Sequence, residues 1–307
     1  MKIVLLDALT FGETDLSAFD TLGEVEVFST TSKEQTQERV KDADVIVTNK
    51  VVITKEMMKN SQNLKLICVA ATGMNNVDLE GAKELGIEVK NVAGYSTASV
   101  IQHTFSMLFY LIGSSRYYDE VVKSGEYAKS PIFTDVSHPF FELKGKKWGV
   151  IGLGEIGRGV ANIASAFGAE VSYYSTSGVN RTDDFQRASL ENLLQTCDII
   201  TIHAPLNDKT QDLLNYENLQ SVKDGAVILN LGRGGIIDEE AVAKIIDERN
   251  ILFGLDVLTQ EPMRADHSLL SVKNRDNLYI TPHIAWTSIE AREKLIASVV
   301  ENIKSLN

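Results

Sequence analysis

Three side chains that are suited to acid–base and anion chemistry each follow a short apolar run in the second half of the chain. Arg233 lies in the glycine-bounded turn of "VILNLGRGGIID", Glu261 follows "GLDVLTQ", and His283 follows "YITP". If these runs are parallel strands, the three residues lie at strand carboxyl ends, the edge at which open α/β sheets bind ligands. Such a set is suited to bind a carboxylated substrate and to move a proton.

Upstream of these residues, the stretch "GVIGLGEIGRGVA" has the spacing G-x-G-x-x-G between an apolar run and a helical pattern. This context is typical of a dinucleotide-binding loop. Gly152 permits the sharp turn, Gly154 lets the backbone approach a pyrophosphate, and Gly157 lets the helix pack on the strand. The helix start, at Glu155 and Ile156, offers free N–H groups to phosphates. The alternative is a purely structural turn, and the strand–turn–helix context favours a dinucleotide.

The next strand predicts which dinucleotide binds. An acidic residue at its end usually hydrogen-bonds the adenosine ribose of NAD. The chain has Ser175 there instead, with Ser177, Asn180 and Arg181 nearby. Because no carboxylate would repel a 2′-phosphate and these side chains would bind one, we expect NADP rather than NAD, with NAD or dual use as the alternative.

With a nicotinamide cofactor, the three side chains are suited to hydride transfer to a 2-oxo acid. His283 would protonate the carbonyl oxygen, and Glu261 would fix its tautomer. Arg233 would bind the substrate carboxylate and carbonyl. Asp256, in the preceding strand, would hold the nicotinamide carboxamide or tune the His283–Glu261 pair. Each catalytic candidate also has a structural alternative. Arg233 could be a surface residue of a turn, Glu261 a solvated acid of a loop, and His283 a residue that caps a strand.

In the first third of the chain, "CVAATGMNNVD" ends a predicted strand with Thr72, Gly73 and Met74. Backbone N–H groups at such a glycine commonly hold a carboxylate, and an ordinary strand-to-helix turn is the alternative. His203, in "TIHAPL", ends another predicted strand and would line the adenine side of the cofactor. The remaining histidines, His103, His138 and His267, are expected to be structural.

Composition narrows the class of protein. The chain has 307 residues, enough for two domains, with 44% hydrophobic residues and a net charge of −12. The negative charge argues against nucleic acid or an anionic membrane as partner. No apolar run reaches the roughly 18 residues needed to cross a bilayer, and we expect a cytoplasmic protein. Cys68 and Cys197 are expected to be buried free thiols, and no residues have the spacing of metal ligands.

Apolar runs alternate with amphipathic stretches in two series, at residues 1–95 and 146–283, which predicts an α/β protein with two parallel sheets. A helical segment beginning "STASVIQHTF" links them, with Ser96 or Ser99 as its N-cap. A last amphipathic helix, "SIEAREKLIASVVENIKSL", is expected to return to the first domain.

Over nearly its full length the sequence resembles the D-isomer-specific 2-hydroxyacid dehydrogenases. The matching segments are "AATGMNNVDL", "AGYSTASVIQHTF", "FELKGKKWGVIGLGEIG", "HAPLNDKT", "ILNLGRGGIIDEEAV", "GLDVLTQEP" and "ITPHIAWTS". The resemblance implies His283, Glu261 and Arg233 as catalytic residues, and a substrate carboxylate near Gly73. It implies further cofactor contacts at Thr104, Ala204, Pro205, Thr210, Leu231, Gly232 and Asp256.

Within this family, "GYSTASVIQHTF" and Trp286 in "PHIAWTS" look most like the glycerate dehydrogenase/hydroxypyruvate reductase group. The resemblance therefore implies reduction of hydroxypyruvate or glyoxylate to a D-2-hydroxy acid. A D-lactate-type dehydrogenase, a formate or phosphonate oxidoreductase, and a non-catalytic dinucleotide-sensing protein on the same fold are the alternatives.

The resemblance also implies an architecture of two doubly wound parallel-sheet domains. A Rossmann cofactor domain, residues 98–285, is inserted into a flavodoxin-like substrate domain formed by residues 1–97 and 286–307. It implies a homodimer built through the cofactor domain, with "SGEYAKSPIFTDVSHPFFELKG" as an arm. Phe133, Phe140 and Phe141 in this arm are candidates for the interface.

Overall fold

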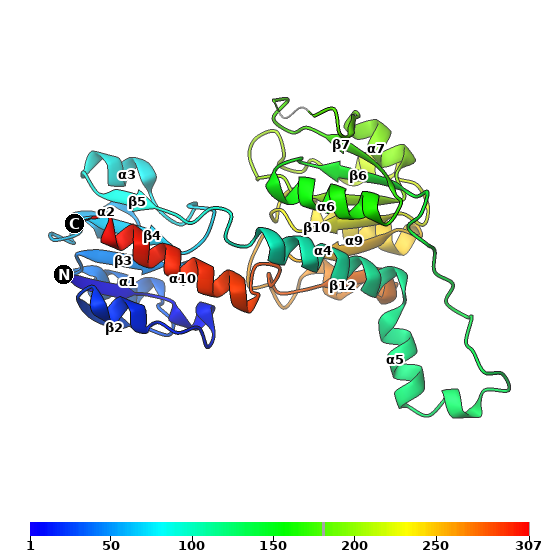
Figure 1. Ribbon diagram of the computed structural model, residues 1–307, viewed down its shortest axis with the longest axis horizontal. Helices are drawn as coiled ribbons and strands as arrows, with labels where there is room; N and C mark the ends of the chain where they lie inside the picture. Colours follow the sequence, from blue (N-terminus) through cyan, green and yellow to red (C-terminus); the bar gives the residue numbers. More distant parts are fainter. Residues whose placement is uncertain (180–181, 307) are drawn as a thin grey trace. The chain divides into compact units, whose positions relative to one another are not determined.

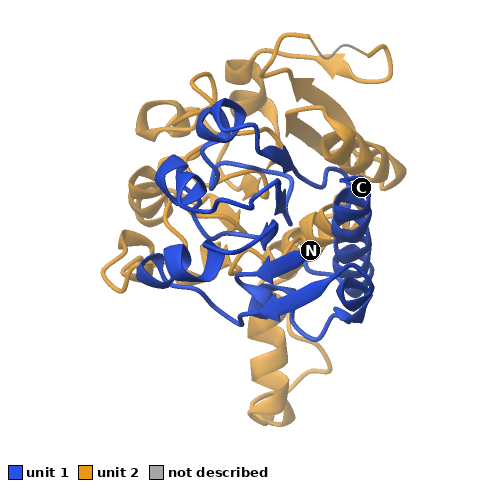
Figure 2. Ribbon diagram, turned by 90° about the vertical axis from the view of Figure 1, so that its left-hand side faces the viewer, with its two compact units in different colours: residues 1–96, 287–307 blue, residues 97–286 orange. Residues whose placement is uncertain are grey.

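The computed structural model describes residues 1–179 and 182–306, and the chain separates into two compact units (Figures 1 and 2). The first unit comprises Met1–Ser96 and Thr287–Asn307, and the second comprises Thr97–Trp286. The chain therefore leaves the first unit once and returns to it once, so that the second unit is an insertion in the first.

The first unit is a five-stranded parallel sheet with the strand order β2-β1-β3-β4-β5. This order is that of flavodoxin-like doubly wound sheets. Its strands are β1 (Lys2–Leu5), β2 (Glu24–Val27), β3 (Val45–Thr48), β4 (Leu66–Val69) and β5 (Glu88–Lys90). Its helices are α1 (Lys33–Val40), α2 (Lys55–Lys59), α3 (Leu79–Glu84) and α10 (Ile289–Lys304), with short 3-10 helices at Ala8–Phe11 and Ser17–Thr21.

The sequence of the first unit explains its layers. The inner strands β3 and β4 read "VIVT" and "LICV" and are buried throughout, as expected when helices cover both faces of a parallel sheet. The edge strand β2 reads "EVEV" and is only partly buried. On α10, Leu295, Val299 and Ile303 recur at helical spacing and are buried. The last helix thus belongs to the first unit, as the sequence predicts (Figure 2).

The second unit is a seven-stranded parallel sheet with the order β12-β11-β10-β9-β6-β7-β8. Its strands are β6 (Lys147–Ile151), β7 (Glu170–Tyr174), β8 (Gln186–Arg187), β9 (Ile199–Ile202), β10 (Val227–Asn230), β11 (Leu252–Leu255) and β12 (Leu278–Ile280). Its helices are α4 (Thr97–Ile112), α5 (Ser115–Lys123), α6 (Glu155–Ala166), α7 (Leu190–Thr196), α8 (Tyr216–Leu219) and α9 (Glu239–Glu248), with 3-10 helices at Tyr127–Lys129, Ser268–Leu270 and Arg275–Asn277. The strand order reverses between β6 and β9, and this reversal is where doubly wound sheets bind ligands.

The segment linking the two series is helical, as the sequence predicts, but it is divided into two helices. It forms α4 and α5, which separate at Gly113 and Ser114, where Ser114 has a left-handed φ of 45°. α4 packs in the core of the second unit, with Met107 and Leu108 fully buried, whereas no described residue of α5 is buried. Ser99 lies inside α4 and is not its N-cap, because the helix already begins after Ser96.

Two predictions from composition can be compared with the structure. Both cysteines are buried and unpaired, as expected. Across residues 1–179 and 182–306, every helix is too short or too polar to span a bilayer.

Candidate active site

The predicted pair of His283 and Glu261 is assembled at the carboxyl ends of β11 and β12. His283 Nδ1 lies 2.7 Å from Glu261 Oε2, and Glu261 Oε1 accepts from Leu258 N at 3.0 Å. Because a carboxylate only accepts, Nδ1 of His283 carries the hydrogen. Nε2 is therefore the ring nitrogen left to exchange a proton with a ligand. The side chains are 24% and 33% exposed, so a ligand can reach the pair.

The backbone of His283 is held in an uncommon conformation. Its φ is 55°, in the left-handed region that is costly for a residue with a Cβ and persists only where neighbours hold it. The Asp256 carboxylate accepts from Ile284 N at 2.8 Å and from Ala285 N at 3.0 Å, and Ser99 Oγ donates to Ala285 O at 2.6 Å. These contacts fix the two residues that follow His283.

Asp256 is buried and hydrogen-bonded within the second unit. Asp256 is 1% exposed, and its Oδ1 also accepts from Thr281 Oγ1 at 2.6 Å. The Asp256 carboxylate therefore positions the turn after His283 through these bonds, and a contact with the nicotinamide carboxamide stays a prediction. His103 Nε2 lies 3.2 Å from Thr281 Oγ1, and burial, opposed by Asp256, lowers the pKa of His103.

Arg233 lies in a turn that an amide side chain organises. Asn230, at the end of β10, accepts from Gly232 N at 3.0 Å through Oδ1 and donates to Arg233 O at 2.8 Å through Nδ2. Asn230 is 2% exposed, whereas Arg233 is half-buried with its Nη1 donating to Gly232 O at 2.8 Å. Asn230 is not among the residues predicted for the site, although an amide just before a glycine-rich turn is a typical signal for such a bond.

The turn of Arg233 is pressed against the loop of Glu261. A Cβ on Gly234 would lie 2.0 Å from the carbonyl carbon of Leu258 and 2.4 Å from Thr259 N, so only glycine fits there. Since β10, β11 and β12 are neighbours in the sheet, Arg233, Glu261 and His283 share one edge of the second unit.

A second feature of this edge is a cavity of about 520 Å³ beside the reversal in strand order. Its lining residues come from the connections after β6, β7 and β9: Gly154, Thr176, Ser177, His203, Pro205, Asn207, Asp208 and Lys209. Gly154, Pro205 and His203 are thus placed at one cavity, as expected for a dinucleotide site.

The glycine loop has the geometry that its spacing predicts. Gly152 has a left-handed φ of 92°, and a Cβ there would lie 2.9 Å from Ala204 backbone atoms. A Cβ on Gly157 would lie 2.1 Å from Gly152 O, whereas one on Gly154 would meet no atom within 4 Å. α6 begins at Glu155 with no side-chain cap, which leaves its first N–H groups directed at the open space.

His203 gives an independent test of whether this cavity fits a nucleotide. Both ring nitrogens are buried, and neither has a hydrogen-bond partner among the described residues. Burial lowers the pKa of His203 to about 3, so the ring is neutral near neutral pH. A buried polar atom without a partner is costly. A heterocyclic ligand with both donor and acceptor atoms, such as adenine, would satisfy the ring, so the residues present fit a dinucleotide.

Several other residues predicted to contact the cofactor are buried in this structure. Thr104 and Thr210 have no exposed surface, and their hydroxyls donate to Val100 O and Pro205 O. Both hydroxyls are thus used inside the fold, and a direct contact of either residue with the cofactor stays a prediction. Ala204, Leu231 and Gly232 are also buried.

The residues after β7, which are predicted to lie near the adenosine ribose of the cofactor, differ in where the structure places them. Ser175 is 5% exposed, and its Oγ accepts from Gly178 N at 3.1 Å, so it shapes the turn after β7. Ser177 and Thr176 are the residues of this turn that line the cavity. Asn180 and Arg181, which we expected to bind a 2′-phosphate, lie outside the described residues.

In the first unit, Thr72, Gly73 and Met74 follow the carboxyl end of β4. Thr72 Oγ1 donates to Val92 O at 3.2 Å, and Gly73 and Met74 are partly exposed. Trp286 is the last residue of the second unit and is half-buried.

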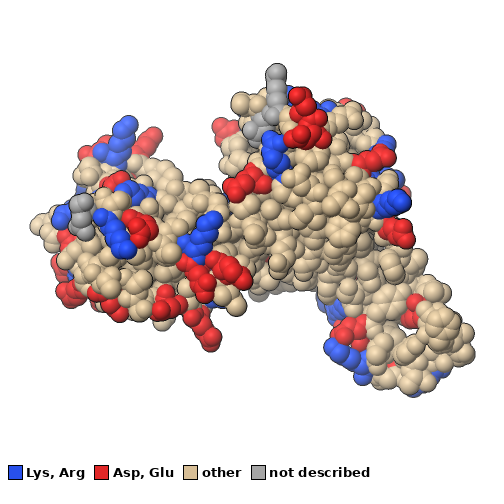
Figure 3. Space-filling view, viewed as in Figure 1, with Lys and Arg blue, Asp and Glu red and all other residues tan. Residues whose placement is uncertain are grey.

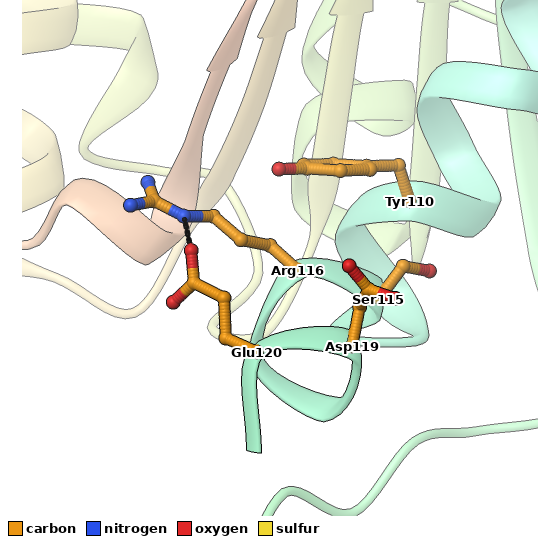
Figure 4. A pocket seen from close by; sticks show the side chains of 5 residues that line it. All are labelled: Tyr110, Ser115, Arg116, Asp119 and Glu120. Carbon is orange, nitrogen blue, oxygen red and sulfur yellow. Dashed lines mark hydrogen bonds and ion pairs between the residues drawn. The ribbon is translucent and has the colours of Figure 1, made fainter. Parts of the chain in front are cut away.

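Another cavity, of about 500 Å³, lies where α4 and α5 meet (Figure 4). Tyr110, Ser115, Arg116, Asp119 and Glu120 line it. The Arg116 guanidinium is already paired with Glu120, with Nε donating to Oε1 at 2.9 Å, and Asp119 adds negative charge. This cavity therefore does not suit an anionic cofactor, in contrast to the cavity beside the glycine loop.

Comparison with known proteins decides the family. Residues 105–285 match the model of the D-isomer specific 2-hydroxyacid dehydrogenase NAD binding domain. The chain belongs to this family. It is 36% identical over 312 aligned residues to a hydroxypyruvate reductase of Blautia hydrogenotrophica, covering 99% of this chain and 96% of that protein. As a member, the chain is a nicotinamide-dependent 2-hydroxyacid dehydrogenase with the two-sheet fold of the family.

Solved structures support the same placement. The chain is similar to an acyclic imino acid reductase in complex with NADPH and D-Arg, with a TM-score of 0.87, 30% identity, and coverage of 100% and 97% of the two chains. It is also similar to the D-lactate dehydrogenase of Aquifex aeolicus complexed with NAD and lactic acid, with a TM-score of 0.85, 27% identity, and coverage of 100% and 95%. A nicotinamide dinucleotide is the cofactor that these neighbours share.

Proposed function

We propose that this dehydrogenase reduces small 2-oxo acids to D-2-hydroxy acids, with hydroxypyruvate or glyoxylate preferred over pyruvate. The observation that carries this proposal is the His283–Glu261 pair on the same sheet edge as Arg233. The nicotinamide, when bound, supplies the hydride. His283 donates the proton from Nε2 to the carbonyl oxygen as negative charge develops there, and Glu261 stabilises the imidazolium. Arg233 binds the substrate carboxylate.

We propose that Thr72, Gly73 and Met74 offer backbone N–H groups to the carboxylate, and that Trp286 limits the size of the substrate side chain. The preference for hydroxypyruvate or glyoxylate is supported by the name of the Blautia relative. The name of the imino acid reductase, at 30% identity, shows how different the substrates of related folds are.

A substrate panel tests this function. Purified protein is mixed with hydroxypyruvate, glyoxylate, pyruvate, 2-oxoisocaproate and phosphonopyruvate, each with NADH or NADPH, and cofactor oxidation is followed by absorbance. The proposal predicts the highest kcat/KM with hydroxypyruvate or glyoxylate. No turnover with any 2-oxo acid, while the protein still binds the dinucleotide, would favour a sensing protein instead.

We further propose that NADPH is preferred over NADH. The support is Ser175, which takes the place of the usual carboxylate; in the cavity that Thr176 and Ser177 line, the charge of Lys209 is offset by that of Asp208. Ser175→Asp is expected to lower kcat/KM for NADPH at least about tenfold, because the new carboxylate repels the 2′-phosphate. Its effect on NADH is expected to be less than about threefold. Ser175→Asn, which has nearly the size of aspartate and keeps an acceptor for Gly178 N without adding charge, is the control. Equal use of both cofactors by the unchanged protein would refute the preference.

We infer that the protein is a homodimer assembled through the arm, defined as residues 124–145. In the arm, Phe133 is 90% and Phe140 is 70% exposed, and Figure 3 shows its outer part largely without charged side chains. Apolar surface of this kind is typical of an interface. Sedimentation is expected to give a dimer for the unchanged protein and a monomer for Phe133→Asp/Phe140→Asp. A monomer in both cases, or a dimer in both, would contradict the inference.

We also propose a cytoplasmic location. Free thiols persist in reducing compartments, and both cysteines are unpaired and buried. Burial raises the pKa of the Cys68 thiol to about 12, which keeps it unreactive. Fractionation of cells followed by immunodetection tests the location.

A further inference from the structure

Glu239 and His267 form a largely buried pair beside the loop that carries Glu261. Glu239 is the first residue of α9, and His267 directly precedes the 3-10 helix at Ser268–Leu270. Their side chains are 11% and 12% exposed, and His267 Nε2 lies 2.9 Å from Glu239 Oε2. The residues are 28 positions apart in the sequence, and from the sequence alone His267 is expected to be structural.

The hydrogen bonds of this pair specify one tautomer of His267. Leu269 N donates to Nδ1 at 3.3 Å, so Nδ1 acts as an acceptor. The proton of the neutral ring is therefore on Nε2, and Nε2 donates to the carboxylate of Glu239. A doubly protonated ring would place an N–H group at Nδ1 against the N–H of Leu269, so the neutral form is the one that satisfies both contacts.

The other oxygen of Glu239 holds the loop at Thr259. Glu239 Oε1 accepts from Thr259 N at 2.6 Å and from Thr259 Oγ1 at 2.8 Å. Thr259 follows Leu258, whose N–H donates to Glu261 Oε1. The Glu239 carboxylate therefore fixes the backbone next to the group that orients Glu261.

The start of α9 does not itself require the Glu239 carboxylate. Asp238 is the N-cap, and its Oδ1 accepts from Glu240 N at 3.0 Å and from Ala241 N at 3.3 Å. The first free N–H groups of the helix thus have a partner already. The contacts of Glu239 lead instead to the loop after β11, which points to a role outside the helix.

We propose that Glu239 and His267 are positioning residues for the Glu261–His283 pair. Through Thr259 they hold the loop so that Glu261 Oε2 stays within hydrogen-bonding distance of His283 Nδ1. Neither residue touches the substrate. The inference rests on the proposed function, because it assigns the pair a purpose in proton transfer. Displacements well below 1 Å at a proton donor are enough to lower the rate of a reaction.

The test compares Glu239→Ala with Glu240→Ala. Glu240 is the next residue of the same helix turn and is exposed, so its removal changes the charge equally without touching the loop. With hydroxypyruvate, Glu239→Ala is expected to lower kcat about tenfold or more, while KM for the 2-oxo acid and the dissociation constant of NADPH change less than about threefold. Glu240→Ala is expected to change kcat less than about twofold.

His267 provides a matched pair of variants. His267→Leu removes the donor and is expected to lower kcat about fivefold or more, whereas His267→Gln keeps an N–H donor and is expected to restore most of the rate. The double variant Glu239→Ala/His267→Leu is expected to be no slower than Glu239→Ala, because both changes disrupt the same hydrogen-bond network. The proposal would be overturned if the loss of kcat in the double variant equalled the product of the two single losses. Equal values of kcat for His267→Leu and His267→Gln would also overturn it.

Hydrogen exchange gives a readout that does not depend on turnover. In Glu239→Ala and His267→Leu, amides of residues 258–268 are expected to exchange faster than in the unchanged protein, with the rest of the second unit unaltered. Unchanged exchange in this loop would overturn the positioning role. If instead the unchanged protein turns over no 2-oxo acid although the loop responds as expected, the proposed function fails and the structural part of the inference stands.

Discussion

Replacing His283 by glutamine is expected to lower kcat for 2-oxo acid reduction by about 10²-fold or more. Glutamine retains a polar side chain, but it cannot give up a proton at neutral pH, so the developing alkoxide has no general acid. Its amide also cannot become a cation that Glu261 stabilises across the present distance of 2.7 Å. The loss should therefore appear in kcat, and binding of the dinucleotide should change little.

Steady-state kinetics with saturating cofactor, together with a fluorescence titration of NADPH, separate these two effects. His138→Gln is the matched control, because His138 lies in the arm and outside the sheet edge that holds the pair. The same chemical change should leave its rate within about twofold of the unchanged protein. A loss below threefold in His283→Gln would show that the proton comes from another group.

Arg233→Ala is expected to lower kcat/KM by about 10²-fold or more. We assign the Arg233 guanidinium as the hydrogen-bond donor to both the substrate carboxylate and the carbonyl oxygen. In comparable sites, loss of one charge-assisted donor to a developing oxyanion lowers the rate by about 10²-fold or more. The turn itself should persist, because Asn230 holds it through the backbone of Gly232 and Arg233.

Arg233→Lys separates charge from geometry. A lysine keeps the charge but lacks the planar fork, so we expect it to recover only part of the rate. Arg233→Ala should also lose discrimination between hydroxypyruvate and the uncharged analogue hydroxyacetone, since the carboxylate would no longer have a cation beside it. Full activity in the lysine variant would mean that a point charge suffices, and undiminished discrimination in the alanine variant would contradict the assignment.

Much of the fold could be predicted from the sequence because buried parallel strands are continuous apolar runs. "VIVT", "LICV" and "VILN" are recognisable without any contact information, and the glycines between strand and helix mark the turns. The sequence does not predict the break between α4 and α5, because the helical periodicity of the residue types continues across Gly113 and Ser114. The backbone, in contrast, leaves the right-handed helical conformation at Ser114.

The catalytic candidates could be predicted for a related reason: they directly follow strands that end at one edge. The residues that support them could not. The contacts of Asp256 with Ile284, of Ser99 with Ala285 and of Glu239 with His267 join positions far apart in the chain. Likewise, sequence cannot reveal that Thr104 and Thr210 are turned inward and fully buried.

The most direct test of the account is to follow the hydride and the proton in one reaction. Hydroxypyruvate is reduced with NADPH that carries deuterium at the transferable C4 position, and the product is examined by chiral chromatography and mass spectrometry for the unchanged protein and for His283→Gln. We expect D-glycerate with one deuterium at C2, formed at least about 10²-fold more slowly by the variant. An L product, a product without deuterium, or equal rates for the two proteins would contradict it.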